Sequence, residues 1–125
     1  MSFRLPLSVA LATTSVLAIP AAAQSMSVGT FLTRAAPLRA NPLMALVSPD
    51  YAVLKGEADA AVRALRADSA ARKAAGKPPI ACVPEGQSLG ITDMLAGLDA
   101  LPSADKRLPL KDGYARVLAQ RFPCR

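Results

Sequence analysis

The chain has 125 residues and a formal net charge of +6, and it contains two cysteines but no histidine and no tryptophan. Without histidine, the Cys–His and Ser–His mechanisms of nucleophilic catalysis are excluded. Aromatic residues make up only 4% of the chain and alanine is abundant, which favours helices over sheets. The composition therefore indicates a small, basic, helical protein.

The first residues have the pattern of a secretory signal peptide. Arg4 is followed by an apolar stretch from Leu5 to Pro20 and then by small residues at Ala21 and Ala23. This order predicts cleavage after Ala23. The alternative is a retained apolar anchor or a core helix. Pro20 and the alanines that follow it argue against both. We expect a signal peptide over 1–23, a periplasmic location and one domain over 24–125 with a net charge of about +5.

The sequence beyond the leader predicts a protein without a membrane span. No later run approaches the roughly 20 apolar residues that are needed to cross a bilayer. The remaining residues, about 102 of them, fit a single small domain with a modest core.

Cys82 and Cys124 are the two cysteines. An even pair in an exported protein is most simply a disulfide. Closing a loop of about 43 residues would stabilise the domain by roughly 4 kcal/mol in the chain-entropy model. Free thiols or metal ligands are the alternative, but without histidine and without C-x-x-C spacing a zinc site would need carboxylates. We expect the disulfide, no metal and no cofactor.

Three helices are expected in the N-terminal half. Ser27 can cap a helix over 28–38. Asn41 before Pro42, and Ser48 before Pro49, each combine a cap residue with proline at the first helical position. They predict a short helix and then a long helix from Pro49 to about Ala75, ended by Gly76. Three- and four-residue spacing predicts these buried positions: Phe31, Leu32, Ala35 and Leu38 in the first helix, and Tyr51, Leu54, Ala58, Ala61, Val62 and Leu65 in the long helix.

The C-terminal half is expected to hold two helices after an ordered crossover, "GKPPIACVPEG". The first lies within 89–101, capped by Ser88 or Thr92, and the second runs from about Pro109 to Arg121. Their predicted buried positions are Ile91, Leu95, Leu98, Tyr114, Val117, Leu118 and Phe122. The expected fold class is therefore all-α, a small single-domain bundle of about five helices with one disulfide.

Few residues have a catalytic pattern. "SADK", Ser103 to Lys106, matches the S-x-x-K spacing of serine–lysine enzymes but stands in a polar loop without their further motifs. Glu57 and Asp59 are two apart on a helix and so point in different directions. Asp93, Asp99 and Glu85 are explained as helix-entry, surface and loop charges. We expect a protein that is not an enzyme.

Basic residues gather at the end of the long helix, at Arg63, Arg66, Arg72, Lys73 and Lys77. A net positive charge attracts acidic partners or anionic envelope polymers. The alternative is a solvated surface that partly compensates the helix dipole. Nucleic acid is not an expected partner, because the export signal leads away from the cytoplasm and no aromatic residues are interleaved with the cations.

Within 81–124, the C-terminal half contains a distinctive set of residues: Cys82, Pro84, Gly86, Phe122, Pro123 and Cys124. With these residues it resembles the Rap/Tai family of immunity proteins associated with type VI secretion. Two further cysteines that are usual in the family are missing from the N-terminal half, so one disulfide is expected and not two.

The resemblance implies an exported all-helical protein that binds and occludes a peptidoglycan-cleaving amidase. The contact residues expected on this basis are Arg66, Arg72, Lys73 and Glu85, and a homodimer is compatible with the sequence. The alternative function is an envelope maintenance protein that binds an anionic cell-wall or outer-membrane component.

Overall fold

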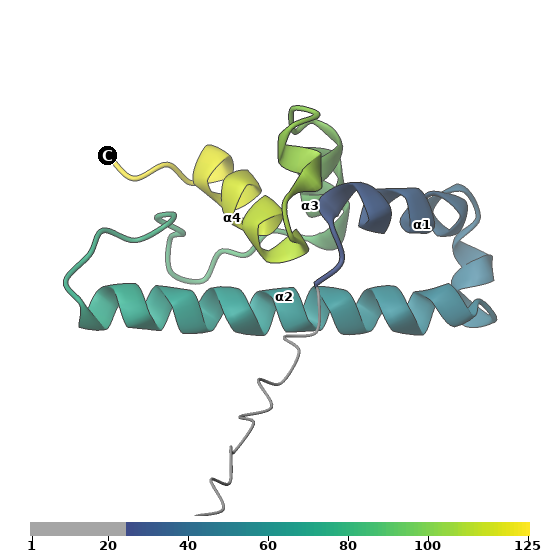
Figure 1. The fold of residues 1–125 in the computed structure, drawn as a ribbon, viewed down its shortest axis with the longest axis horizontal. Helices are drawn as coiled ribbons and strands as arrows, with labels where there is room; N and C mark the ends of the chain where they lie inside the picture. The colour runs from purple at the N-terminus through teal and green to yellow at the C-terminus, as the bar shows by residue number, and fades with distance from the viewer. Residues whose placement is uncertain (1–24) are drawn as a thin grey trace, which may run out of the picture.

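The protein is described by a computed structural model over residues 25–125, so the expected signal peptide and its cleavage site lie outside the described residues. The elements in chain order are α1 (Val28–Ala40), η1 (Pro42–Leu46), α2 (Pro49–Ala74), α3 (Ile91–Asp99), η2 (Asp105–Arg107) and α4 (Leu110–Arg121), where η is a 3₁₀ helix (Figure 1). Over 25–125 there is no strand, and Ser27 and Pro109 form an isolated antiparallel bridge.

The all-α prediction is confirmed, and the described part has four α-helices where the sequence predicted about five helices. The difference is the segment after Asn41, which forms a five-residue 3₁₀ helix. Pro42 is the first residue of this 3₁₀ helix and Pro49 is the first residue of α2, positions at which the missing N–H breaks no helical hydrogen bond, so each proline begins a new helix.

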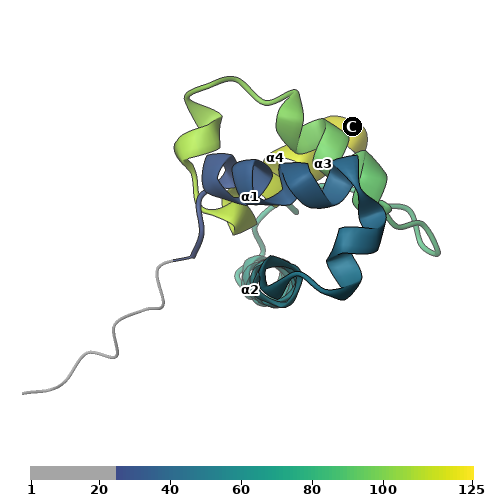
Figure 2. The ribbon, with the colours of Figure 1, turned by 90° about the vertical axis from the view of Figure 1, so that its right-hand side faces the viewer.

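The long helix α2 forms one layer, and α1, α3 and α4 lie together along one side of it (Figures 1 and 2). α2 contributes only three fully buried residues to the core, Leu54, Ala61 and Leu65. Their spacings of seven and four residues place them on one line along the helix. The opposite side of α2 is therefore exposed along its whole length.

The core lies where α3 and α4 cross above α2 and against α1. Leu98 and Leu110 are completely buried, as is Val28. Two glycines allow this close packing: a Cβ atom at Gly97 would collide with Val117, and one at Gly113 with Val28. The residues of this core are Val28, Phe31, Ala35, Leu54, Ala61, Leu65, Met94, Leu98, Leu101, Leu110, Tyr114 and Val117.

The segment that enters α1 is held between α4 and α2. The Val28 N–H donates to the Leu108 carbonyl at 3.0 Å, and the Leu110 N–H donates to the Met26 carbonyl at 2.9 Å. The Met26 N–H donates to the Glu57 carboxylate at 3.1 Å. These bonds join residues far apart in the chain and define how α1 and α4 begin.

Two of the predicted caps are confirmed. The Ser27 hydroxyl accepts from the Thr30 N–H, and the Ser48 hydroxyl accepts from the Asp50 N–H, each at 3.2 Å. The prediction for the third α-helix was wrong, because Gly90 occupies the N-cap position and neither Ser88 nor Thr92 caps α3. Asn41 makes no side-chain cap bond either.

Eight of the predicted buried positions are buried, among them Leu98 and Tyr114, and six more are partly buried, but Tyr51, Val62 and Ile91 were wrong. Tyr51 is 48% exposed and Ile91 is 61% exposed. Val62 is also exposed at the side of α2. Tyr51 and Ile91 lie in the first turns of α2 and α3, where no neighbouring helix covers them.

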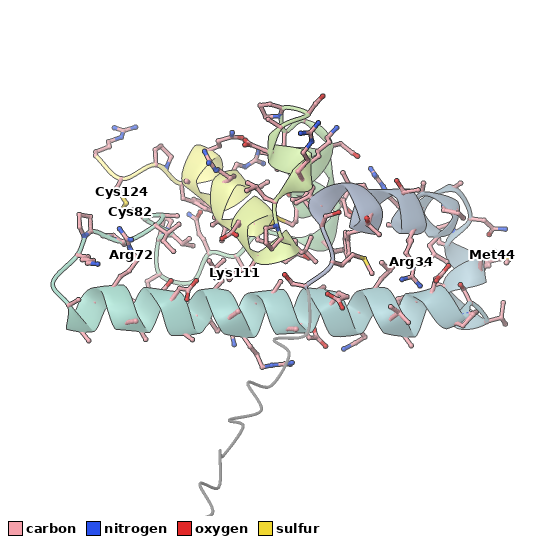
Figure 3. All side chains as sticks on the ribbon, in the orientation of Figure 1. Arg34, Met44, Arg72, Cys82, Lys111 and Cys124 are labelled. Carbon is pink, nitrogen blue, oxygen red and sulfur yellow. A yellow bond between two sulfur atoms is a disulfide. The ribbon has the colours of Figure 1, made fainter. Side chains whose placement is uncertain are left out.

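The disulfide prediction is confirmed: Cys82 is bonded to Cys124, with their Cα atoms 5.0 Å apart (Figure 3). The Cys82 N–H also donates to the Phe122 carbonyl at 2.9 Å. The crossover after α2 is thereby attached to the segment that follows α4. Over residues 25–125, no helix combines the length and the apolar character that a bilayer span requires.

Candidate functional site: an apolar end and its groove

Five apolar side chains are exposed together at one end of the molecule, on η1 and at the start of α2. We call Leu43, Met44, Leu46, Val47 and Tyr51 the apolar end; Met44 marks it in Figure 3. Leu43 is 75% exposed and Leu46 is 83% exposed. A 3₁₀ helix has three residues per turn, so these two leucines share its outward side.

A groove of about 360 Å³ lies beside the apolar end, between α1, α2 and α3. η1 closes it on one side through Pro42 and Ala45. Its walls are mostly apolar and come from α1 (Phe31, Ala35, Leu38), α2 (Tyr51, Leu54, Ala58) and α3 (Ile91, Leu95). Tyr51 belongs both to the apolar end and to the groove, so the two form one surface.

Charged residues at the edge of the groove are paired with opposite charges. Arg39 donates to Asp99 at 2.6 Å, and Lys55 donates to Asp59 at 2.8 Å. The hydrogen bond from Lys55, together with its charge, lowers the pKa of Asp59 and reciprocally raises the pKa of Lys55. Because both pairs are neutral as units, the edge of the groove carries no net charge from these residues.

The apolar end is supported from beneath by an ion pair between Arg34 of α1 and Asp50 of α2 (Figure 3). Asp50 is in the first turn of α2, where a carboxylate is favoured by the helix dipole. This pair joins α1 to the start of α2 on either side of η1. The two helices that hold η1 are thus connected by a side-chain contact as well as by the chain.

The predicted contact residues lie at the other end of α2 and are not brought to the groove. Arg66 and Lys73 are exposed on α2, and Glu85 is exposed in the crossover. Arg72 has a different environment, since its Nε donates to the Pro78 carbonyl at 2.7 Å. Arg72 therefore attaches the crossover to α2, a structural contact that sequence reasoning did not anticipate.

The residues with a catalytic pattern are also dispersed. Ser103 is exposed in the loop before η2, and Lys106 is half-buried within η2. Glu57 is engaged by the Met26 N–H. Within residues 25–125 there is no group of three or more acidic or cysteine side chains placed to hold a metal ion.

Sequence reasoning missed the apolar end, although a signal was present. "PLMALV" places four large apolar residues between two prolines. So short a segment cannot direct all of them to one side, because successive residues of any helix point in different directions. Some of these apolar side chains therefore had to stay exposed to solvent unless another element of the protein covered them.

Comparison of the chain with protein-family models, with curated proteins and with solved structures found no match.

Proposed function

We propose that this protein is an exported periplasmic binding protein that recognises a protein partner through the apolar end and its groove. The observation that carries the proposal is the exposure of Leu43, Leu46 and Val47, each more than 70% accessible. Clustered exposed apolar side chains are uncommon on monomers and mark interaction sites. Tyrosine, methionine and arginine are enriched at protein interfaces, and this surface exposes Tyr51, Met44 and Arg39.

The occupant that fits this surface is a set of apolar side chains from a folded protein. The groove can receive one anchoring side chain, and the leucines around it exclude water from the contact. An anionic polymer would find no net positive charge here, because Arg39 and Lys55 are paired with carboxylates.

We further propose an immunity-type mechanism, in which the bound domain covers the cleft of a peptidoglycan-cleaving amidase. The support for this partner is the resemblance of Cys82, Pro84, Gly86 and the "FPC" ending to the Rap/Tai family. Occlusion requires a rigid domain and no covalent chemistry. The disulfide contributes to that rigidity by restraining the crossover and the C-terminal segment.

The alternative, binding of an anionic envelope component, has its own support in the second half of α2. Arg63, Arg66, Arg72 and Lys73 outnumber Asp68 there. Such binding depends on long-range attraction and should disappear as ionic strength rises. A close-packed apolar contact should lose mainly association rate.

The test is capture of partners from periplasmic extract at low and high salt, followed by affinity measurement with the purified partner. Leu43→Ser with Leu46→Ser should weaken binding by at least about tenfold, because two anchors lose their apolar contact. The matched variant carries Arg66→Ala, Arg72→Ala and Lys73→Ala, and it should bind within about threefold of the wild type at high salt.

Each outcome separates the hypotheses. A cell-wall amidase that is retained at high salt and inhibited in a hydrolysis assay supports the immunity mechanism. If only the variant with Arg66, Arg72 and Lys73 replaced lost binding, the contact would lie on the second half of α2. The proposal that the apolar end binds the partner would then be wrong. Retention of only salt-labile polymer or lipid would favour the envelope alternative.

A further inference from the structure

The side of α2 that faces away from the other helices has a regular surface. Ala52, Gly56, Asp59, Arg63, Ala67 and Ala70, which we call the outer face, are all exposed. At 100° per residue, they lie within about 40° of the direction opposite to the buried line of Leu54, Ala61 and Leu65. In Figures 1 and 2, α1, α3 and α4 all lie on the other side of α2.

Gly56 in this face has no role in the packing of its own domain. A Cβ atom at Gly97 or Gly113 would strike a neighbouring helix, whereas one at Gly56 would meet nothing within 4 Å. Glycine in a helix interior is destabilising relative to alanine. With the space beside Gly56 open over residues 25–125, the glycine leaves room at this point for a second helix to approach.

The charges along α2 are unevenly distributed. Three carboxylates and one lysine precede Ala61, whereas four cations and one carboxylate follow it. A second α2 running in the opposite direction would therefore place an acidic half against a basic half at both ends. The dipoles of the two helices would also be antiparallel, which is the favourable sense.

The outer face is nearly symmetric about the position of Ala61. Asp59 and Arg63 lie two residues to either side, Gly56 and Ala67 five and six residues away, and Ala52 and Ala70 nine residues away. In an antiparallel pair centred there, Asp59 of each copy, which pairs with Lys55 of its own helix at 2.8 Å, would also face Arg63 of the other. Ala52 of each copy would face Ala70 of the other, and Gly56 would lie beside Ala67, where the absent side chain allows close approach of the backbones.

We propose that two copies of this chain associate through the outer faces of α2, in an antiparallel two-fold pair with reciprocal Asp59–Arg63 contacts. The interface is isologous, so it closes as a dimer and does not extend into filaments. The pair leaves the apolar end open, because this lies at the end of α2, and it meets the groove only at Asp59, which belongs both to the outer face and to the groove edge. Asp59 is therefore shared by the two proposed surfaces, whereas Gly56 does not line the groove and tests the dimer separately.

Charge reversal tests the proposal on the full chain as purified with its disulfide intact. Sedimentation equilibrium should show a concentration-dependent dimer for the wild type. Asp59→Arg and Arg63→Asp should each weaken self-association by at least about tenfold, because each brings like charges together twice. An equimolar mixture of the two single variants should restore the dimer, since both contacts then join opposite charges.

The mixture separates a direct contact from a structural effect, because two damaged folds would not repair each other. A protein that stays monomeric up to about 1 mM overturns the proposal. So does a dimer that both reversals leave unchanged, or one that the mixture fails to restore.

Gly56→Gln provides a second test that does not alter charge. Glutamine is a better helix former than glycine, so the melting temperature of the monomer should be unchanged or higher. The dimer should weaken by at least about tenfold, because the longer side chain separates the two backbones. The matched control is Ala64→Gln, an exposed α2 position beside the outer face; equal weakening by both variants, or by neither, contradicts the proposed surface.

Discussion

The core and the apolar end are built from the same residue types but have opposite environments. Leu98 is 0% exposed and Leu46 is 83% exposed, while Tyr114 is 3% and Tyr51 is 48% exposed. The difference is whether a second helix lies over the side chain. Residues of the core are covered by α1, α3 and α4, whereas η1 joins two helices and has no layer above it.

The comparison shows that the apolar character of a side chain does not by itself determine how much that side chain stabilises the fold. Side chains of the core stabilise the fold through burial, at about 25 cal/mol per Å² of apolar surface removed from water. Those of the apolar end remain in water after folding and contribute little to stability. Their apolar surface is available to a partner instead.

The largest expected change comes from the disulfide, which lies at the other end of the molecule from η1. Replacement of Cys82 and Cys124 by serine should lower the free energy of unfolding by about 4 kcal/mol, because the denatured chain loses the restraint on a 42-residue separation. Urea denaturation measures this effect. Under conditions in which the double serine variant is still folded, it should bind the partner of the apolar end as the wild type does.

Reducing agent is the control for this prediction. It should destabilise the wild type by a similar amount and leave the double serine variant unchanged. Loss of partner binding by a well-folded reduced protein would mean that the two ends of the molecule are coupled.

The second prediction compares one leucine from each region. Leu98→Ala should lower the free energy of unfolding by about 3 kcal/mol, since it removes a fully buried side chain and leaves a cavity. Leu46→Ala should change it by less than about 0.5 kcal/mol, since the side chain is exposed already. Urea denaturation of both variants in parallel decides; a large loss at Leu46 would show that the apolar end belongs to the folding core.

The smallest expected change concerns pH and a tyrosine of the core, Tyr114. Burial, with a smaller contribution from the charge of Asp59, raises the pKa of Tyr114 above its ordinary value, which is about 10. The folded state therefore holds this proton at a pH at which the unfolded state releases it. The resulting stability is present below about pH 10 and is lost as pH rises through the folded pKa.

Urea midpoints at pH 9 and pH 11 measure this loss. Tyr114→Phe should show a smaller fall in stability than the wild type between these values. The pKa of Lys111 is raised by its hydrogen bond to Asp68, so part of the fall should remain in this variant. A Tyr114→Phe variant whose stability falls as far as that of the wild type would contradict the assignment to Tyr114.

The candidate site was harder to predict from the sequence than the helices were. Ser27 and Ser48 were predicted as caps because the residues that they bind are two or three positions away. The groove depends on Phe31, Tyr51 and Ile91, which come from three helices. The sequence indicated the helix of each residue but not which helices would leave a gap.

The sequence by itself determined the helical class, nearly all helix boundaries and the disulfide pairing. These follow from local hydrogen bonding, from proline and glycine positions, and from there being only two cysteines. Only the tertiary structure decided that Tyr51 and Ile91 stay outside, that Arg72 binds the crossover, and that Gly56 has open space where Gly97 has none. The physical reason is that exposure depends on neighbours from distant parts of the chain, which local periodicity does not specify.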